Sequence, residues 1–405
     1  MKFLVSFLPL LASALPLVFA ADSTESNQNH GANGSPEHSQ EGHGNGGKNG
    51  LNIVLTNDDS WASANIRATY DALKSDGHNV LLVGPAVQQS GKGGTFVVPS
   101  TNITAPGGEF GSIPVGAPYF GHDVKDDHIW YFNGTPAATT VFALDIVVPM
   151  VFGHNKKVDL VVSGPNEGQN AGPFLYTLSG TVGATYASVE RGIPAVAFSA
   201  GNSTHRSFTT ITRDKHDAAT IAGRLTANFV AALAKGVDTK KSRLLPLGVG
   251  IGINYPVFGP GNPCVDPPFT LTRMTGGAVI DQITLDPTTG FPVVNNLVAP
   301  GLNTVINGRK DLPGETPIAA QCKTSVTVFS VDYDAPADVA APIQKHLLLV
   351  NPSESSRWAM SEWPGLRVGP TSSPFGAFPR YLIVISDFII DYREYDPAAR
   401  ETKCN

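Results

Sequence analysis

Short runs of apolar residues recur along the chain, and polar residues and glycines follow each of them. Such runs, without regular polar alternation, are typical of strands that are buried on both faces of a parallel sheet. They occupy residues 53–55, 80–83, 158–162, 193–199 and 249–254. The pattern therefore predicts a mostly parallel central sheet.

Segments with helical spacing lie between these runs. After the first run, Ile66, Tyr70 and Leu73 recur on one helical face. Ser63 can cap this helix, and Gly77 can end it. Further helices are expected from residue 136, from residues 178–181 and over 214–235. A strand, a helix and a strand within about thirty residues form a right-handed βαβ unit, so the sequence predicts an α/β fold.

The pattern changes from Val257 onward. Pro and Gly become frequent, short alternating segments such as 325–331 occur, and residues 347–350 and 381–390 are apolar. This part has no cluster of candidate catalytic residues like those upstream. We expect a core over 51–256 and a β-rich extension over 257–405 that packs on the core or on a partner subunit.

The N-terminal fifty residues read as a leader and a linker. Residues 1–20 have the positive start, the apolar stretch and the small-residue end of a secretory signal. A membrane anchor is the alternative, because the apolar stretch is just long enough to span a bilayer. Residues 21–50 are almost entirely polar and are expected to be a disordered linker. We therefore expect a secreted protein, with no membrane attachment after cleavage.

Composition narrows the class of protein. The chain has 405 residues, 41% of them hydrophobic, which is enough for a large core. A net charge of −6 argues against wrapping of nucleic acid and against a polybasic membrane surface. In an oxidising compartment two of the three cysteines can pair; we expect Cys264 with Cys322, which leaves Cys404. N-glycosylation sequons begin at Asn33, Asn102, Asn133 and Asn202.

Candidate chemistry begins directly after the first apolar run, at Asp58 and Asp59. Two adjacent carboxylates at the end of a buried strand repel each other, so they need a cation or hydrogen-bond donors. Ligands of open α/β sheets bind at the carboxyl ends of strands, and a divalent metal with oxygen ligands would relieve the repulsion. The alternative is that one Asp caps the next helix and the other is solvated in a turn.

Three later segments add polar groups at strand or helix ends. Ser90 follows the second run, in a loop whose glycine spacing does not fit a nucleoside-triphosphatase phosphate loop. The segment 163–172 is rich in glycines, which let backbone N–H groups approach an anion, and its Asn166 offers a neutral oxygen. The turn 179–181 can cradle a phosphate at a helix N-terminus. An ordinary glycine-rich turn and simple capping by Thr181 are the alternatives.

These segments together resemble the SurE (survival protein E) phosphatases over about residues 51–256. The resemblance rests on five motifs in order: Thr56-Asn57-Asp58-Asp59, Gln89-Ser90-Gly91, Asn133-Gly134-Thr135-Pro136-Ala137, Ser163-Gly164-Pro165-Asn166-Glu167-Gly168-Gln169-Asn170 and Ser179-Gly180-Thr181-Val182-Gly183. It implies a three-layer, Rossmann-like fold and a metal-dependent phosphatase that acts on nucleoside monophosphates and other phosphomonoesters. It also implies a homodimer. The leader and the long C-terminal part suggest a secreted, fungal-type relative.

Residue by residue, the resemblance implies that the metal ligands are Asp58, Asp59, Ser90 and Asn166. Four oxygen donors suit Mg²⁺ or Mn²⁺. The same two aspartates are the implied catalytic residues, with Asp58 placed to orient or deprotonate a water. The implied phosphate-binding residues are Asn57, Gly168, Asn170, Ser179, Gly180 and Thr181.

One position departs from the family pattern, because Ser60 stands where glycine is usual. If the backbone there needs a positive φ, Ser costs on the order of 1 kcal/mol. This departure keeps a second hypothesis open: a secreted, non-catalytic protein that binds phosphate or nucleotides. A third is a secreted structural protein in which the C-terminal part is the active feature. Nucleotides, polyphosphate and small phosphoesters are all open as substrates.

Overall fold

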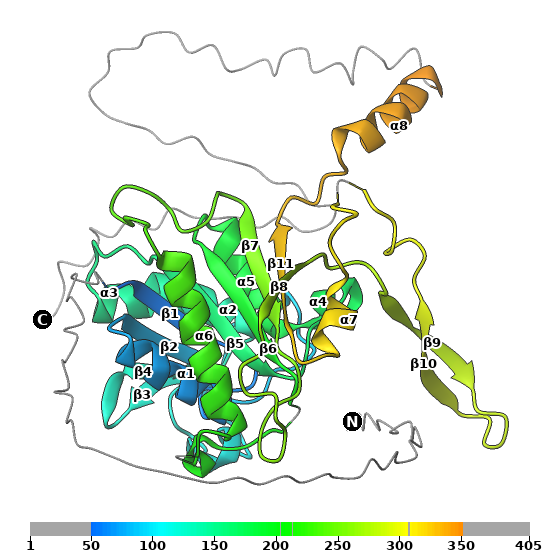
Figure 1. The fold of residues 1–405 in the computed structure, drawn as a ribbon. Helices are drawn as coiled ribbons and strands as arrows, with labels where there is room; N and C mark the ends of the chain where they lie inside the picture. The colour runs from blue at the N-terminus through cyan, green and yellow to red at the C-terminus, as the bar shows by residue number, and fades with distance from the viewer. Residues whose placement is uncertain (1–49, 203, 213, 307, 351–405) are drawn as a thin grey trace, which may run out of the picture.

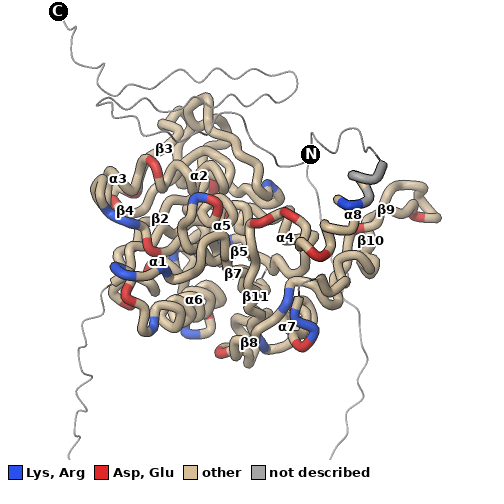
Figure 2. The backbone as a smooth tube through the Cα atoms, turned by 90° about the horizontal axis from the view of Figure 1, so that it is seen from above, with Lys and Arg blue, Asp and Glu red and all other residues tan. Residues whose placement is uncertain are grey.

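The computed structural model describes residues 50–202, 204–212, 214–306 and 308–350 (Figure 1). The expected leader, most of the linker, the apolar stretch 381–390 and Cys404 lie outside these residues. Within them, no helix combines the length and the apolar character that crossing a bilayer requires. Lys and Arg positions are interspersed with Asp and Glu positions along the described backbone (Figure 2).

A nine-stranded sheet forms the centre of the molecule. Its strands are β1 (Asn52–Thr56), β2 (Asn79–Pro85), β3 (Phe120–Asp123), β4 (Asp126–Phe132), β5 (Leu160–Glu167), β6 (Ala195–Ala200), β7 (Val249–Asn254), β8 (Phe269–Thr272) and β11 (Thr324–Ser330). The order is β3-β4-β2-β1-β5-β6-β7-β11-β8, and the six strands from β4 to β7 are parallel. The predicted, mostly parallel sheet is therefore confirmed.

Helices cover both faces of this sheet (Figure 1). On one face, α1 (Ala64–Ser75) and α6 (Ala218–Ala234) pack on each other and bury Ile53 and Leu55 of β1. On the other face, α2 (Pro136–Phe142), the following turn η2 (Ala143–Val147) and α5 (Gly180–Glu190) cover the strand residues that point the opposite way, such as Val54. The result is the predicted three-layer α/β architecture, with β1 in the middle. The remaining helical segments are η1 (Glu109–Gly111), α3 (Val148–Val151), α4 (Pro173–Leu178), η3 (Phe208–Thr210), α7 (Glu315–Ala319) and α8 (Ala337–Val350).

Local hydrogen bonding corrects one expected helix start and decides the capping residue of another helix. The helix expected from residue 214 begins at Ala218, because the Asp217 side chain accepts hydrogen bonds from the first N–H groups of α6. The helix α5 is capped by Ser179 rather than Thr181, since Ser179 Oγ accepts a hydrogen bond from Val182 N. This frees the Thr181 hydroxyl for another contact.

The described C-terminal part contains strands of the main sheet, a separate hairpin and two helices. β8 and β11 extend the main sheet, while β9 (Val279–Leu285) and β10 (Pro292–Val298) form a separate hairpin that projects from the body (Figure 1). A disulfide joins Cys264 to Cys322. The extension also contains α7 and α8, and α8 includes the apolar residues 347–350. The described residues beyond Val257 therefore contain helices as well as the expected strands.

Candidate functional site

The site lies at the carboxyl end of β1, beside the second half of β5. Thr56, the last residue of β1, pairs with Ser163 of β5, and β5 then runs on to Glu167. Asp58 and Asp59 are almost completely buried, with 2% and 1% of their surface exposed. The backbone N–H of Glu167 donates a hydrogen bond of 2.7 Å to Asp59 Oδ2. The aspartate pair and the segment after β5 are thus in direct contact.

Asp58 lies against the N-terminus of α5. Thr181 Oγ1 donates a 2.5 Å hydrogen bond to Asp58 Oδ1. Burial raises the pKa of Asp58, while the Thr181 hydroxyl and the backbone N–H groups of Gly180 and Thr181 oppose that rise. A Cβ added at Gly180 would lie 2.8 Å from Asp58 Cβ, so glycine permits this close approach. The helix end therefore stabilises Asp58 as a carboxylate.

Asp59 lacks a comparable set of donors. Its pKa is raised well above the usual range, mainly because of burial and then because of the negative charges of Asp58, Glu167 and Glu109. Several acidic groups thus crowd into one buried place. A bound cation would offset this repulsion directly.

Three buried oxygens beside the aspartates have no hydrogen-bond partner: Asp59 Oδ1, Asn57 Oδ1 and Asn166 Oδ1. The other side-chain atoms of both Asn residues are engaged, since Asn57 Nδ2 donates to Ser60 O and Asn166 Nδ2 donates to Gly168 O. Buried acceptors without donors are costly unless something else binds them. Carboxylate and amide oxygens fit a hard divalent cation.

Ser60, which stands where the family usually has glycine, has a positive backbone φ of 86°. The residue is fully buried. Its hydroxyl accepts a hydrogen bond of 3.1 Å from Ala62 N, which partly offsets the cost of the left-handed conformation. The turn after Asp59 is thus kept with Ser in the place of glycine.

Ser90 lies on the loop after β2, and this loop contacts the segment of the two aspartates. The N–H of Gln89 donates a 2.7 Å hydrogen bond to the carbonyl of Asp58, which anchors this loop to the site. Ser90 itself is exposed, and its hydroxyl accepts a 2.5 Å hydrogen bond from Gln88 Nε2. Its role as a metal ligand stays a prediction.

The donors expected to bind phosphate are partly used within the protein. Gly168 N donates to Ala200 O, and the backbone and side-chain N–H groups of Asn170 donate to Asn254 Oδ1 and Ser199 Oγ. These bonds hold the glycine-rich segment to β6 and β7. The roles of the predicted residues in phosphate binding stay predictions. The N-terminus of α5, which was expected to bind phosphate, contacts Asp58.

Sequence reasoning did not single out Glu167, Glu109 and His205. The His205 imidazole bridges the carboxylates of Glu167 and Glu109. His205 follows β6 at the same edge of the sheet as Asp58, and this position after a buried strand was the signal that could have identified it.

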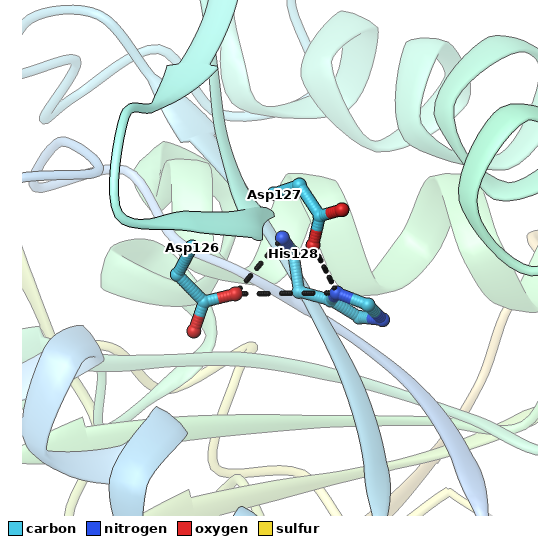
Figure 3. Close-up of side chains that lie close together, drawn as sticks. All are labelled: Asp126, Asp127 and His128. Carbon is cyan, nitrogen blue, oxygen red and sulfur yellow. Dashed lines mark hydrogen bonds and ion pairs between the residues drawn. The ribbon is translucent and has the colours of Figure 1, made fainter.

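A second acidic group lies elsewhere. Asp126, Asp127 and His128 are consecutive residues at the start of β4, where His128 hydrogen-bonds the carboxylates of both aspartates (Figure 3). Because β4 is parallel to β2, its start lies at the edge of the sheet opposite Asp58. Tyr70 and Lys74 already donate to the Asp126 carboxylate. We assign no metal to this cluster.

Comparison with known proteins identifies similar chains. A family model described as "Survival protein SurE" matches residues 53–276. An "Acid phosphatase" of Yarrowia lipolytica is 45% identical over 337 residues, which cover 82% of this chain and 93% of the relative. A "5'-nucleotidase SurE" of Lawsonia intracellularis is 31% identical over 209 residues, 51% of this chain and 66% of the relative. The crystal structure of the SurE protein from Aquifex aeolicus aligns with a TM-score of 0.49 at 20% identity, covering 74% of this chain and 99% of that one.

Proposed function

The chain belongs to the SurE family, and we propose that it hydrolyses phosphate monoesters with the help of a divalent metal ion, Mg²⁺ or Mn²⁺. Relatives named acid phosphatase and 5'-nucleotidase support a phosphomonoester hydrolase. The observation that carries the metal dependence is the buried Asp58–Asp59 pair with the unpartnered oxygens of Asp59 and Asn166 beside it.

Asp58, Asp59 and Asn166 would hold the metal, with Ser90 as the fourth ligand that the family resemblance implies. When bound, the metal would polarise a phosphoryl oxygen and lower the pKa of a water. Thr181 keeps Asp58 oriented and favours its ionised form, so Asp58 is ready to orient or deprotonate the attacking water. Thr181 and Gly180 would also lie beside the charge that develops on the phosphoryl group.

A phosphatase assay of the chain from residue 21 onward tests this proposal. We expect release of phosphate from p-nitrophenyl phosphate with Mg²⁺ or Mn²⁺ and its loss with a chelator. Asp59→Asn should abolish turnover, while Asp266→Asn, a change at an exposed carboxylate, should leave it intact. Absence of hydrolysis with either metal, together with retained binding of phosphate, would favour the non-catalytic binding protein instead.

The substrate class follows the names of the two relatives. We include nucleoside monophosphates among the substrates, because one relative is a 5'-nucleotidase and the other an acid phosphatase. Comparing adenosine 5'-monophosphate with glycerol phosphate measures the preference. Equal kcat/KM values for the two would contradict a nucleotide preference.

We also propose that the protein is secreted. The leader-like residues 1–20, the sequons and the disulfide between Cys264 and Cys322 all suit an oxidising, extracellular compartment. N-terminal sequencing of protein from the culture medium of a secretory host checks this. A chain that begins at Ala21 is the expected product, and a chain retained with its leader in the membrane fraction would contradict the proposal.

A homodimer through the projecting hairpin is the proposed assembly. Ile283 of β9 lies directly opposite Val294 of β10, and both are about two-thirds exposed or more, at 72% and 67%. The same hairpin face carries exposed Leu285 and Val298. An isolated two-stranded hairpin is marginally stable in water, so a second copy of the chain would cover this apolar face.

Light scattering with size-exclusion chromatography tests the dimer. Replacing both Ile283 and Val294 with Lys should shift the protein to a monomer. Gln282→Lys, on the opposite face of β9, is the matched control and should leave the dimer intact. A wild-type chain that elutes as a monomer would refute the assembly.

A further inference from the structure

We propose that His205 is a positioning residue that clasps together two of the segments carrying the metal ligands, the end of β5 with Asn166 and the loop after β2 with Ser90. The proposal rests on the proposed function, because it concerns how these two segments are held for a metal ion. It assigns a role to the segment after β6, which the family motifs quoted above do not include.

Both ring nitrogens of His205 are occupied by carboxylates. Nδ1 lies 2.5 Å from Glu167 Oε2, and Nε2 lies 2.9 Å from Glu109 Oε1. An imidazole can donate from both nitrogens only as the cation. In agreement, the pKa of His205 is raised to about 9, chiefly by its hydrogen bond to Glu167, with Glu109 also raising it against the effect of burial.

Each of these two glutamates is also hydrogen-bonded to a segment that carries a predicted metal ligand. The backbone N–H of Glu167 donates to Asp59 Oδ2 at 2.7 Å. Glu109 Oε2 accepts a 2.8 Å hydrogen bond from the N–H of Gln88, two residues before Ser90. The His205 ring therefore connects the end of β5 with Glu109 of η1, and Glu109 in turn holds the loop after β2.

The surroundings of the ring indicate a built arrangement rather than a chance surface contact. The Glu167 side chain is only 4% exposed, whereas His205 and Glu109 are 33% and 23% exposed. The Phe110 ring packs against His205 in a tilted arrangement, with 4.6 Å between the ring centroids. Phe110 has a φ of 55°, a conformation that costs a bulky L-residue on the order of 1 kcal/mol and that is retained where function requires it.

Loss of His205 has two opposing effects on the affinity of the site for a cation. The Glu167 segment loses its anchor, which misplaces Asp59 and weakens metal binding. Two carboxylates also lose their counter-charge, which attracts a cation more strongly. A variant that removes one positive and one negative charge together separates the geometric effect from the charge effect.

The test is therefore the double variant His205→Ala, Glu109→Gln, which keeps the net charge of the wild type. Isothermal titration with Mn²⁺ should show affinity weakened about 10-fold, the lower end of the 10–100-fold loss that outer-shell partners of metal ligands cause. The Mn²⁺ concentration for half-maximal hydrolysis should rise in parallel, with the KM for substrate unchanged within about twofold. His205→Gln, which keeps one donor for Glu167, should recover part of the loss.

A surface histidine–carboxylate pair on the same segment provides the control. His216 pairs with Asp214 at the surface, at 3.1 Å, so His216→Ala with Asp214→Asn should bind Mn²⁺ like the wild type. Wild-type Mn²⁺ affinity in the His205 double variant would overturn the clasp and leave the hydrolase proposal standing. A wild-type chain that neither binds Mn²⁺ nor needs it for hydrolysis would overturn the metal proposal itself, and the clasp with it.

Discussion

Glu315 gives the molecule a pH-dependent stability that one substitution should remove. This carboxyl begins α7 and is 1% exposed. It accepts hydrogen bonds from Gly172 N at 2.5 Å and from Thr327 Oγ1 at 2.9 Å. Gly172 ends the glycine-rich segment that starts near Asn166, so Glu315 ties the C-terminal part to the candidate site.

Burial raises the pKa of Glu315 from 4.5 to about 7, although both hydrogen bonds oppose the rise. Between these values the native chain keeps a proton that the unfolded chain releases, so the free energy of unfolding falls as pH increases. The difference between 4.5 and about 7 corresponds to about 3 kcal/mol. This contribution is fully present below pH 4.5 and is lost by about pH 7.

Urea unfolding with the disulfide intact, at several pH values from 4.5 to 7.5, measures the effect. Glu315→Gln is neutral at every pH, so its curve should lack this decline of about 3 kcal/mol between pH 4.5 and 7. Glu190→Gln, at an exposed carboxyl, should follow the wild type. Parallel curves for the wild type and Glu315→Gln would refute the reasoning.

Three further substitutions test the site. Thr181→Val removes a hydrogen bond to the Asp58 carboxylate, worth about 1.5–3 kcal/mol, so kcat should fall roughly tenfold or more in steady-state assays; an unchanged kcat would contradict the contact. Gly180→Ala forces a Cβ to within 2.8 Å of Asp58, so metal-dependent turnover should be lost in the same assay while circular dichroism stays native. Ser60→Gly relieves a φ of 86° but loses the acceptor for Ala62 N, so the two effects on the free energy of unfolding should cancel to within about 1 kcal/mol. Urea unfolding measures this, and a large gain in stability would show that the hydroxyl contributes nothing.

The parts of the site that follow from one stretch of sequence could be predicted. β1 is a continuous apolar run, so its burial and the polar residues Asp58 and Asp59 at its end are visible locally. The departure from the family pattern at Ser60 is also local, so the sequence could state what a positive φ there would cost, and the structure has that φ.

Contacts between distant segments could not be predicted. His205, Glu109 and Glu167 meet only because β6, β5 and the loop before β3 bring them to one edge of the sheet. The pairing of β11 with β7, which are separated in the chain by β8, β9, β10 and α7, likewise depends on how the chain returns and not on any local pattern. Capping by Thr181 was the alternative to a phosphate cradle at this turn, but Ser179 takes the capping hydrogen bond and leaves Thr181 for Asp58.

Anomalous diffraction from a crystal grown with Mn²⁺ tests the central claim most directly. The account predicts one strong peak at bonding distance, roughly 2.0–2.2 Å, from carboxylate oxygens of Asp58 and Asp59 and from Asn166 Oδ1, with Ser90 turned toward it. A peak at the Asp126 cluster with none between the aspartates would contradict the account.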